Sequence, residues 1–135
     1  MKTLLRIGFL SIFSGVVFTS CLDNDEYETV QSVEKVKIDS VAIVNDTMNV
    51  FDVQSIRTYQ KFTQQCEGFY GYDYVYTSDF ERNVTAYKFK TNANCGTGTF
   101  SAFNQINFAP KVAGTYQFKF STGDNTFITK TIVVQ

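Results

Sequence analysis

Three carboxylates lie close together in the middle of the chain, at Asp73, Asp79 and Glu81. Two carboxyl groups can act as general acid and general base in glycoside hydrolysis when a fold holds them at a suitable separation. Carboxylate oxygens are also the usual ligands of calcium. These three residues surround the end of a predicted strand, however, and no second segment supplies a partner. We therefore predict solvated turn residues, with no catalytic role and no bound metal.

The chain contains no histidine. Histidine is the commonest general base and the commonest metal ligand, so the ordinary catalytic triads and zinc sites are excluded. We predict a protein that is not an enzyme and that uses no cofactor. Residues 35–135 carry ten Lys/Arg against eight Asp/Glu, and this balance is not basic enough for binding to nucleic acid.

Four tyrosines alternate along one segment, at Tyr70, Tyr72, Tyr74 and Tyr76. Alternation places them on the same face of a β-strand. If that face is exposed, the rings form a binding platform that could stack on sugars or contact another protein. The alternative, which the strand preference of tyrosine favours, is that the rings form half of the core.

The first 20 residues have the three-part pattern of an export signal. Lys2 and Arg6 give a positive start, an apolar run of 12 residues covers Ile7 to Phe18, and two small residues follow. A membrane-spanning helix needs about 20 apolar residues, so this run is too short to remain as an anchor. We predict that residues 1–20 are a signal peptide that is removed.

The sequence Phe18-Thr19-Ser20-Cys21 resembles the lipobox of bacterial lipoproteins, in the looser form of those from Bacteroidota. The resemblance implies that diacylglycerol alkylates the thiol of Cys21 and that the new amino terminus is acylated, for example with palmitate. Three acyl chains would hold the protein on the membrane almost permanently. The alternative is an ordinary secretory signal with an incidental cysteine.

Acidic residues directly follow Cys21, at Asp23, Asp25, Glu26 and Glu28. This cluster resembles the signal that directs Bacteroidota lipoproteins to the outer face of the outer membrane. It also has the composition of a solvated, flexible tether, and both interpretations can hold at once. We assign residues 21–34 to such a tether.

Cys66 and Cys95 remain once Cys21 is assigned to the lipid. An even pair of cysteines in an exported chain predicts a disulfide, because the compartment favours oxidation. Ligation of a metal by two thiols alone is not expected.

Residues 35–135 suit one domain, and they show no sustained helical periodicity. Several segments of strand length alternate with Asn, Asp, Gly and Ser turns, and 16% of the chain is aromatic. This pattern predicts an all-β fold of about seven strands, arranged as an antiparallel sandwich. The predicted strands lie near 36–43, 55–63, 69–77, 84–91, 100–108, 115–121 and 127–134.

The segment from Phe108 to Phe118 resembles the turn into the sixth strand of immunoglobulin-like domains. The resemblance implies that Tyr116 is a tyrosine corner, whose hydroxyl bonds back to the turn, and that Phe118 points into the core. Together with Ile38-Asp39-Ser40-Val41 and Thr131-Ile132-Val133-Val134, this layout resembles uncharacterised Bacteroidota lipoproteins, which imply no particular activity.

Two short patterns, Asp39-Ser40-Val41 and Asp46-Thr47-Met48, resemble the acceptor sites for O-glycosylation in Bacteroidota. The resemblance implies sugar on Ser40 and Thr47.

These features predict a non-catalytic lipoprotein of the cell outer membrane, lipid-anchored and exposed at the cell surface, that acts in binding or in an assembly with a protein partner. One alternative is a glycan-binding accessory lipoprotein of a polysaccharide uptake system. The chain resembles the small lipoproteins of such systems in predicted location and fold class only. A hydrolase is the other alternative.

Overall fold

The computed structural model describes residues 27–135. The predicted signal peptide, Cys21 and the first three residues of the acidic cluster lie outside this range. Nine strands and no helix occur within it, which confirms the all-β prediction. The strands are β1 (Val30–Val36), β2 (Ser40–Ile43), β3 (Thr47–Met48), β4 (Gln54–Gln64), β5 (Glu67–Ser78), β6 (Glu81–Thr91), β7 (Thr97–Phe108), β8 (Gly114–Gly123) and β9 (Thr126–Val134).

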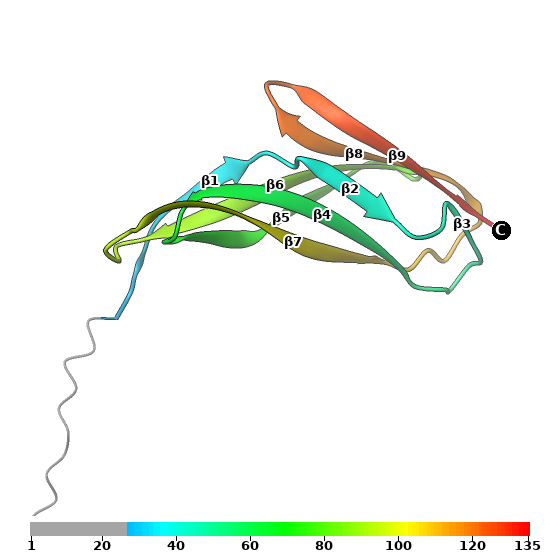
Figure 1. The fold of residues 1–135 in the computed structure, drawn as a ribbon. Helices are drawn as coiled ribbons and strands as arrows, with labels where there is room; N and C mark the ends of the chain where they lie inside the picture. Colours follow the sequence, from blue (N-terminus) through cyan, green and yellow to red (C-terminus); the bar gives the residue numbers. More distant parts are fainter. Residues whose placement is uncertain (1–26) are drawn as a thin grey trace, which may run out of the picture.

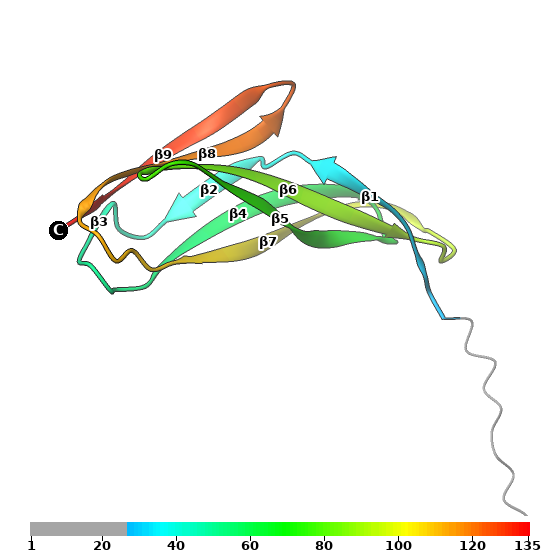
Figure 2. The same ribbon diagram turned by 180° about the vertical axis from the view of Figure 1, so that it is seen from behind.

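The strands form two sheets, consistent with a β-sandwich (Figure 1). The larger sheet has six strands in the order β1-β6-β8-β9-β3, and β5 pairs with the remaining edge of β6. The smaller sheet has three strands in the order β2-β4-β7. Seen from behind, β5 and β6 of the larger sheet lie in front (Figure 2). β5 and β7 run along the same side of the molecule, one in each sheet.

The N-terminal part of the sheet differs from the prediction. β1 begins at Val30, five residues before the expected start of the domain, and pairs with β6. The single strand expected near 36–43 is two strands in different sheets. The chain crosses between them at Ile38, whose side chain is buried and whose N–H donates to the carbonyl oxygen of Ser121 at 3.1 Å. A buried apolar residue at the crossing explains why one continuous apolar pattern covers both strands.

The prediction of a wholly antiparallel sandwich is wrong for two of the strand pairs. β6 lies parallel to β8, and β3 lies parallel to β9. β1 and β8 share one edge of β6, because β1 pairs with its second half and β8 with its first half. Alternation along a strand shows which face is buried but not which strand lies beside it, so the sequence pattern could not predict this arrangement.

The core lies between the sheets and is rich in aromatic rings. The ring of Phe118 is 5.0 Å from that of Phe108 and 6.1 Å from that of Phe120, measured between centroids. Burial of each such ring contributes roughly 2–3 kcal/mol to folding. The buried cluster consists of Ile38, Val41, Met48, Ile56, Val84, Ala86, Phe108, Tyr116, Phe118, Phe120, Ile132 and Val134.

The contact predicted for Tyr116 is present. Its hydroxyl donates to the carbonyl oxygen of Val112 at 2.9 Å, and Phe118 is completely buried. The strand that follows this turn, β8, nevertheless lies parallel to its neighbour β6, whereas immunoglobulin sheets are antiparallel. The local turn therefore matches the resemblance more closely than the strand order does.

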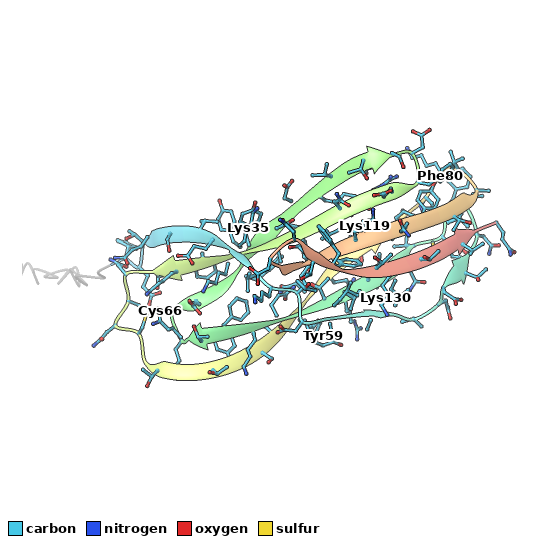
Figure 3. The ribbon with its side chains drawn as sticks, turned by 90° about the horizontal axis from the view of Figure 1, so that it is seen from above. Lys35, Tyr59, Cys66, Phe80, Lys119 and Lys130 are labelled. Carbon is cyan, nitrogen blue, oxygen red and sulfur yellow. A yellow bond between two sulfur atoms is a disulfide. The ribbon has the colours of Figure 1, made fainter. Side chains whose placement is uncertain are left out.

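A disulfide joins Cys66 and Cys95, with Cα atoms 5.1 Å apart, and confirms the predicted bridge. It links the turn between β4 and β5 to the connection between β6 and β7. Cys66 lies at one end of the sandwich and Phe80 near the other (Figure 3). The bridge therefore holds the end that is remote from the turn between β5 and β6.

Candidate functional site

The structure does not bring the three candidate carboxylates together. Asp73 pairs with Thr85 in the middle of β5, whereas Glu81 begins β6. The carboxylate of Glu81 accepts a hydrogen bond from Lys119 Nζ at 2.6 Å, which lowers the pKa of Glu81. No group of three His, Cys, Asp or Glu residues suited to a metal occurs among residues 27–135.

The four tyrosines of β5 do not form a common exposed platform. The register between β5 and β6 shifts between Phe69 and Gly71, so Tyr70 is an extra residue in the strand. Phe69 and Tyr72 consequently lie on the same side, with ring centroids 4.7 Å apart, and both pack against the core. Tyr70 is 61% exposed and lies beside Val33 in a shallow depression. A bulge of this kind cannot be predicted from an alternating sequence pattern.

The other three tyrosines line a groove between the two sheets. Tyr72 and Tyr74 are partly buried, while Tyr76 is 69% exposed at the open end. The groove has a volume of about 1010 Å³, the size of a large ligand site. Its lining comes from β5, from the end of β7 and from the loop after β7. The lining residues are Tyr72, Tyr74, Tyr76, Arg82 and Tyr116, together with residues 77–80 and 105–112.

Arg82 closes one end of this groove. Its side chain is only 6% exposed, and its Nη atoms donate to the carbonyl oxygens of Ser78, Asp79 and Glu81 at 2.7 to 2.9 Å. The ring of Tyr76 covers it, with 4.0 Å between Cζ and the ring centroid. Within residues 27–135 no carboxylate forms an ion pair with Arg82. The guanidinium therefore fixes the turn between β5 and β6 through main-chain oxygens.

A buried polar network runs from the groove into the smaller sheet. The hydroxyls of Tyr72 and Thr58 are 2.6 Å apart and share a hydrogen bond. Gln60 donates to Thr58, and Asn104 donates to Gln60 at 3.0 Å. Thr58 and Gln60 are completely buried. Directional bonds of this kind hold the two sheets at one relative position.

Burial raises the pKa of both inner tyrosines above the ordinary value of 10. It raises the pKa of Tyr72, although hydrogen bonds with Thr58 and Gln60 lower it. It raises the pKa of Tyr74 to about 12, although the nearby charge of Arg82 lowers it. Neutral phenols at physiological pH donate and accept hydrogen bonds but are poor nucleophiles, so these rings suit binding.

The strand β7 borders the groove and pairs only with β4 within residues 27–135. Its other edge is free. Residues 91–110, which include all of β7, contain no Asp, Glu, Lys or Arg. Two phenylalanines on the strand are well exposed, Phe100 and Phe103. Sequence reasoning missed this feature, although the long uncharged run was visible in the sequence.

The two proposed glycosylation residues are at least accessible. Ser40 begins β2 and Thr47 begins β3, and both side chains are exposed. Neither residue lines the groove.

Comparison of the chain with protein-family models, with curated proteins and with solved structures found no match. A helix long and apolar enough to span a membrane is absent from residues 27–135.

Proposed function

We propose that this chain is a non-catalytic binding module of the cell outer membrane, held there by lipid on Cys21, that accepts an extended protein segment as an added strand beside β7. One observation carries the binding proposal. The free, uncharged edge of β7 borders a groove of about 1010 Å³ that tyrosines line on the opposite side.

The unequal size of the two sheets supports an added strand. The larger sheet has six strands and the smaller one three. Beyond β7 no further strand of the smaller sheet covers the inner face of β5, so Tyr74 and Tyr76 border open space among the described residues. A strand added to β7 would lie over these rings and would complete the smaller sheet on that side.

The chemistry of β7 indicates what kind of segment fits. A free strand edge presents main-chain N–H and C=O groups, and an extended peptide satisfies them whatever its side chains are. Every second side chain of the added strand would then point into the groove, toward the tyrosines. Because β7 has no charge, it gives no electrostatic preference for a charged segment. We therefore assign an uncharged, extended protein segment as the occupant.

The proposed location is supported by the N-terminal residues of the chain. The leader, the lipobox-like sequence before Cys21 and the acidic cluster after it support export, lipidation and exposure at the cell surface. The tyrosine-corner contact supports an immunoglobulin-like relationship, which we keep as part of the proposal.

Site-specific photo-crosslinking in intact cells tests the binding proposal. A photoreactive phenylalanine at Asn107, which lines the groove, should form a discrete adduct with a polypeptide. The same group at Thr129, exposed on β9, should not. The adduct should disappear when S101E and Q105E place two negative charges on β7.

Two results would overturn the proposal. Identical adducts from both positions would show non-specific contact, and an adduct with a glycan would assign the groove to sugar. Purified partner from a specific adduct should bind the full chain and should fail to bind the S101E/Q105E variant.

A further inference from the structure

The free edge of β7 lacks the usual protection against pairing with another strand. Natural edge strands carry lysines, prolines, bulges or inward-pointing charges, or they are very short. β7 has 12 residues without a charge or a proline. From Phe100 to Phe108 its pairing with β4 is regular, without a bulge. An uncovered edge of this kind favours pairing with another strand or aggregation.

The other free edges are protected. β1 carries Glu34 and Lys35. β5 has register shifts at two places, near Tyr70 and near Thr77, and carries Asp73 on its length. The opposite edge of the smaller sheet is β2, which has only four residues. β9 carries Lys130 in the part that lies beyond its short pairing with β3. β7 is thus the exception among the long edges of the described part of the chain.

We propose that the strand added to β7 is the β7 strand of a second copy of this chain, antiparallel about a two-fold axis at Phe103. This inference rests on the proposed function, because it names the occupant of the same edge. In an antiparallel two-fold interface each strand meets itself, so a charge near the axis would lie close to the like charge of the second copy. A strand with no charge avoids this conflict at every register.

The register about Phe103 follows from exposure. Phe103 is 58% exposed, and Tyr59 and Arg57 on the neighbouring strand lie near its ring. On the axis it would face Phe103 of the second copy, and aromatic cross-strand pairs are among the more stabilising ones. Ser101 would then lie opposite Gln105 of the second copy. The two smaller sheets would join into one sheet of six strands that extends over the groove.

Charge variants of the full chain, purified in detergent, test this assignment by analytical ultracentrifugation. The wild-type protein should be a dimer. S101E/Q105E and S101K/Q105K should each weaken the dimer at least about tenfold, because residues 101 and 105 of the two copies face each other. An equimolar mixture of the two variants should restore the dimer, since opposite charges then meet across the axis.

Two controls separate the interface from folding and from the detergent. S40K/T47K adds two charges on β2 and β3, away from β7, and should leave the dimer intact. Phe103→Cys should form a disulfide between copies on oxidation, whereas Thr129→Cys should not. Circular dichroism should show that all variants are folded, since the substituted side chains are exposed.

The outcomes also distinguish this inference from the proposed function. A monomeric wild type whose Asn107 probe captures a different protein overturns the self-pairing and leaves the binding module intact. A dimer that neither charge variant weakens, and in which Phe103→Cys forms no disulfide between copies, uses another face, which overturns the inference. A monomer with no specific adduct overturns both proposals.

Discussion

The hydroxyl of Tyr116 donates a hydrogen bond to the carbonyl oxygen of Val112, four residues earlier, at 2.9 Å. The ring itself is almost completely buried and lies 4.9 Å from the ring of Phe108, between centroids. This contact closes the turn from β7 into β8 and thereby fixes one wall of the groove.

Tyr116→Phe removes only the hydroxyl and should lower the free energy of unfolding by about 1 kcal/mol, the usual contribution of one such bond. Urea denaturation measures the change. Tyr87→Phe on β6 is the matched control, because its hydroxyl makes no hydrogen bond within residues 27–135, and it should change stability by less than about 0.5 kcal/mol. Equal stability of Y116F and the wild type would show that the corner contact does not stabilise the turn.

Cys66→Ser should destabilise the domain by about 3.5 kcal/mol, because the bridge spans 29 positions and restricts a long loop in the unfolded chain. The melting temperature should fall by roughly 10–20 °C. Cys95→Ser should give the same value, and reduction of the wild type should reproduce it. A melting temperature that none of these changes alters would contradict a stabilising bridge.

Glu67 predicts a pH dependence of stability near the disulfide. Its carboxylate accepts hydrogen bonds from Lys88 at 2.6 Å and from the N–H groups of Thr63 and Gln64. Burial raises the pKa of Glu67. These bonds and the charge of Lys88 lower it by a larger amount, so the pKa is lowered from 4.5 overall. The stabilisation is therefore fully present above pH 4.5 and is lost as the pH falls through the lowered pKa of the folded state.

Glu67→Gln should cost roughly 2–3 kcal/mol at pH 7, since it leaves the Lys88 ammonium and buried N–H groups without their charged acceptor. The loss should shrink at lower pH, because the wild type then loses the same interaction. Denaturation at several pH values measures it. Glu34→Gln, on the exposed side of β1, is the control and should keep the wild-type pH dependence.

The sequence predicted six of the strands well, β4 to β9, because each is a complete alternating segment between turns. The prediction failed where local pattern carries no information about neighbours. Tyr70 was assigned to the same face as Tyr72, and the bulge that separates them comes from the pairing with β6. The groove exists because β5 and β7 belong to different sheets, and no local pattern encodes that relationship. Only the uncharged run along β7 could have indicated it.

Cys21→Ser tests the proposed lipid attachment to the membrane. The variant should lose the lipid and should leave the membrane fraction or remain unprocessed, since under this proposal the lipid is the anchor. Fractionation and mass determination of the mature chain measure the result. Cys66→Ser is the control, because it replaces a cysteine outside the lipobox, and this variant should stay membrane-bound. A C21S protein that is processed and membrane-bound would overturn lipidation.

Arg82 should be more important for the shape of the groove than its single charge suggests. Its planar guanidinium reaches three carbonyl oxygens of the turn between β5 and β6 at once. Arg82→Lys keeps the charge, but an ammonium on a flexible stem cannot reproduce that fork. We expect the free energy of unfolding to fall by roughly 2–3 kcal/mol, as for other hydrogen bonds to charged groups in buried sites.

Lys119→Arg is the control. It lies at the partly exposed ion pair with Glu81, keeps its charge as well and should change stability by less than about 0.5 kcal/mol. Denaturation measures both variants, and hydrogen exchange of residues 77–81 should rise in R82K only. If R82K were as stable as the wild type, with unchanged exchange in the turn, the charge alone would suffice and the carbonyl contacts would not be what holds the end of the groove.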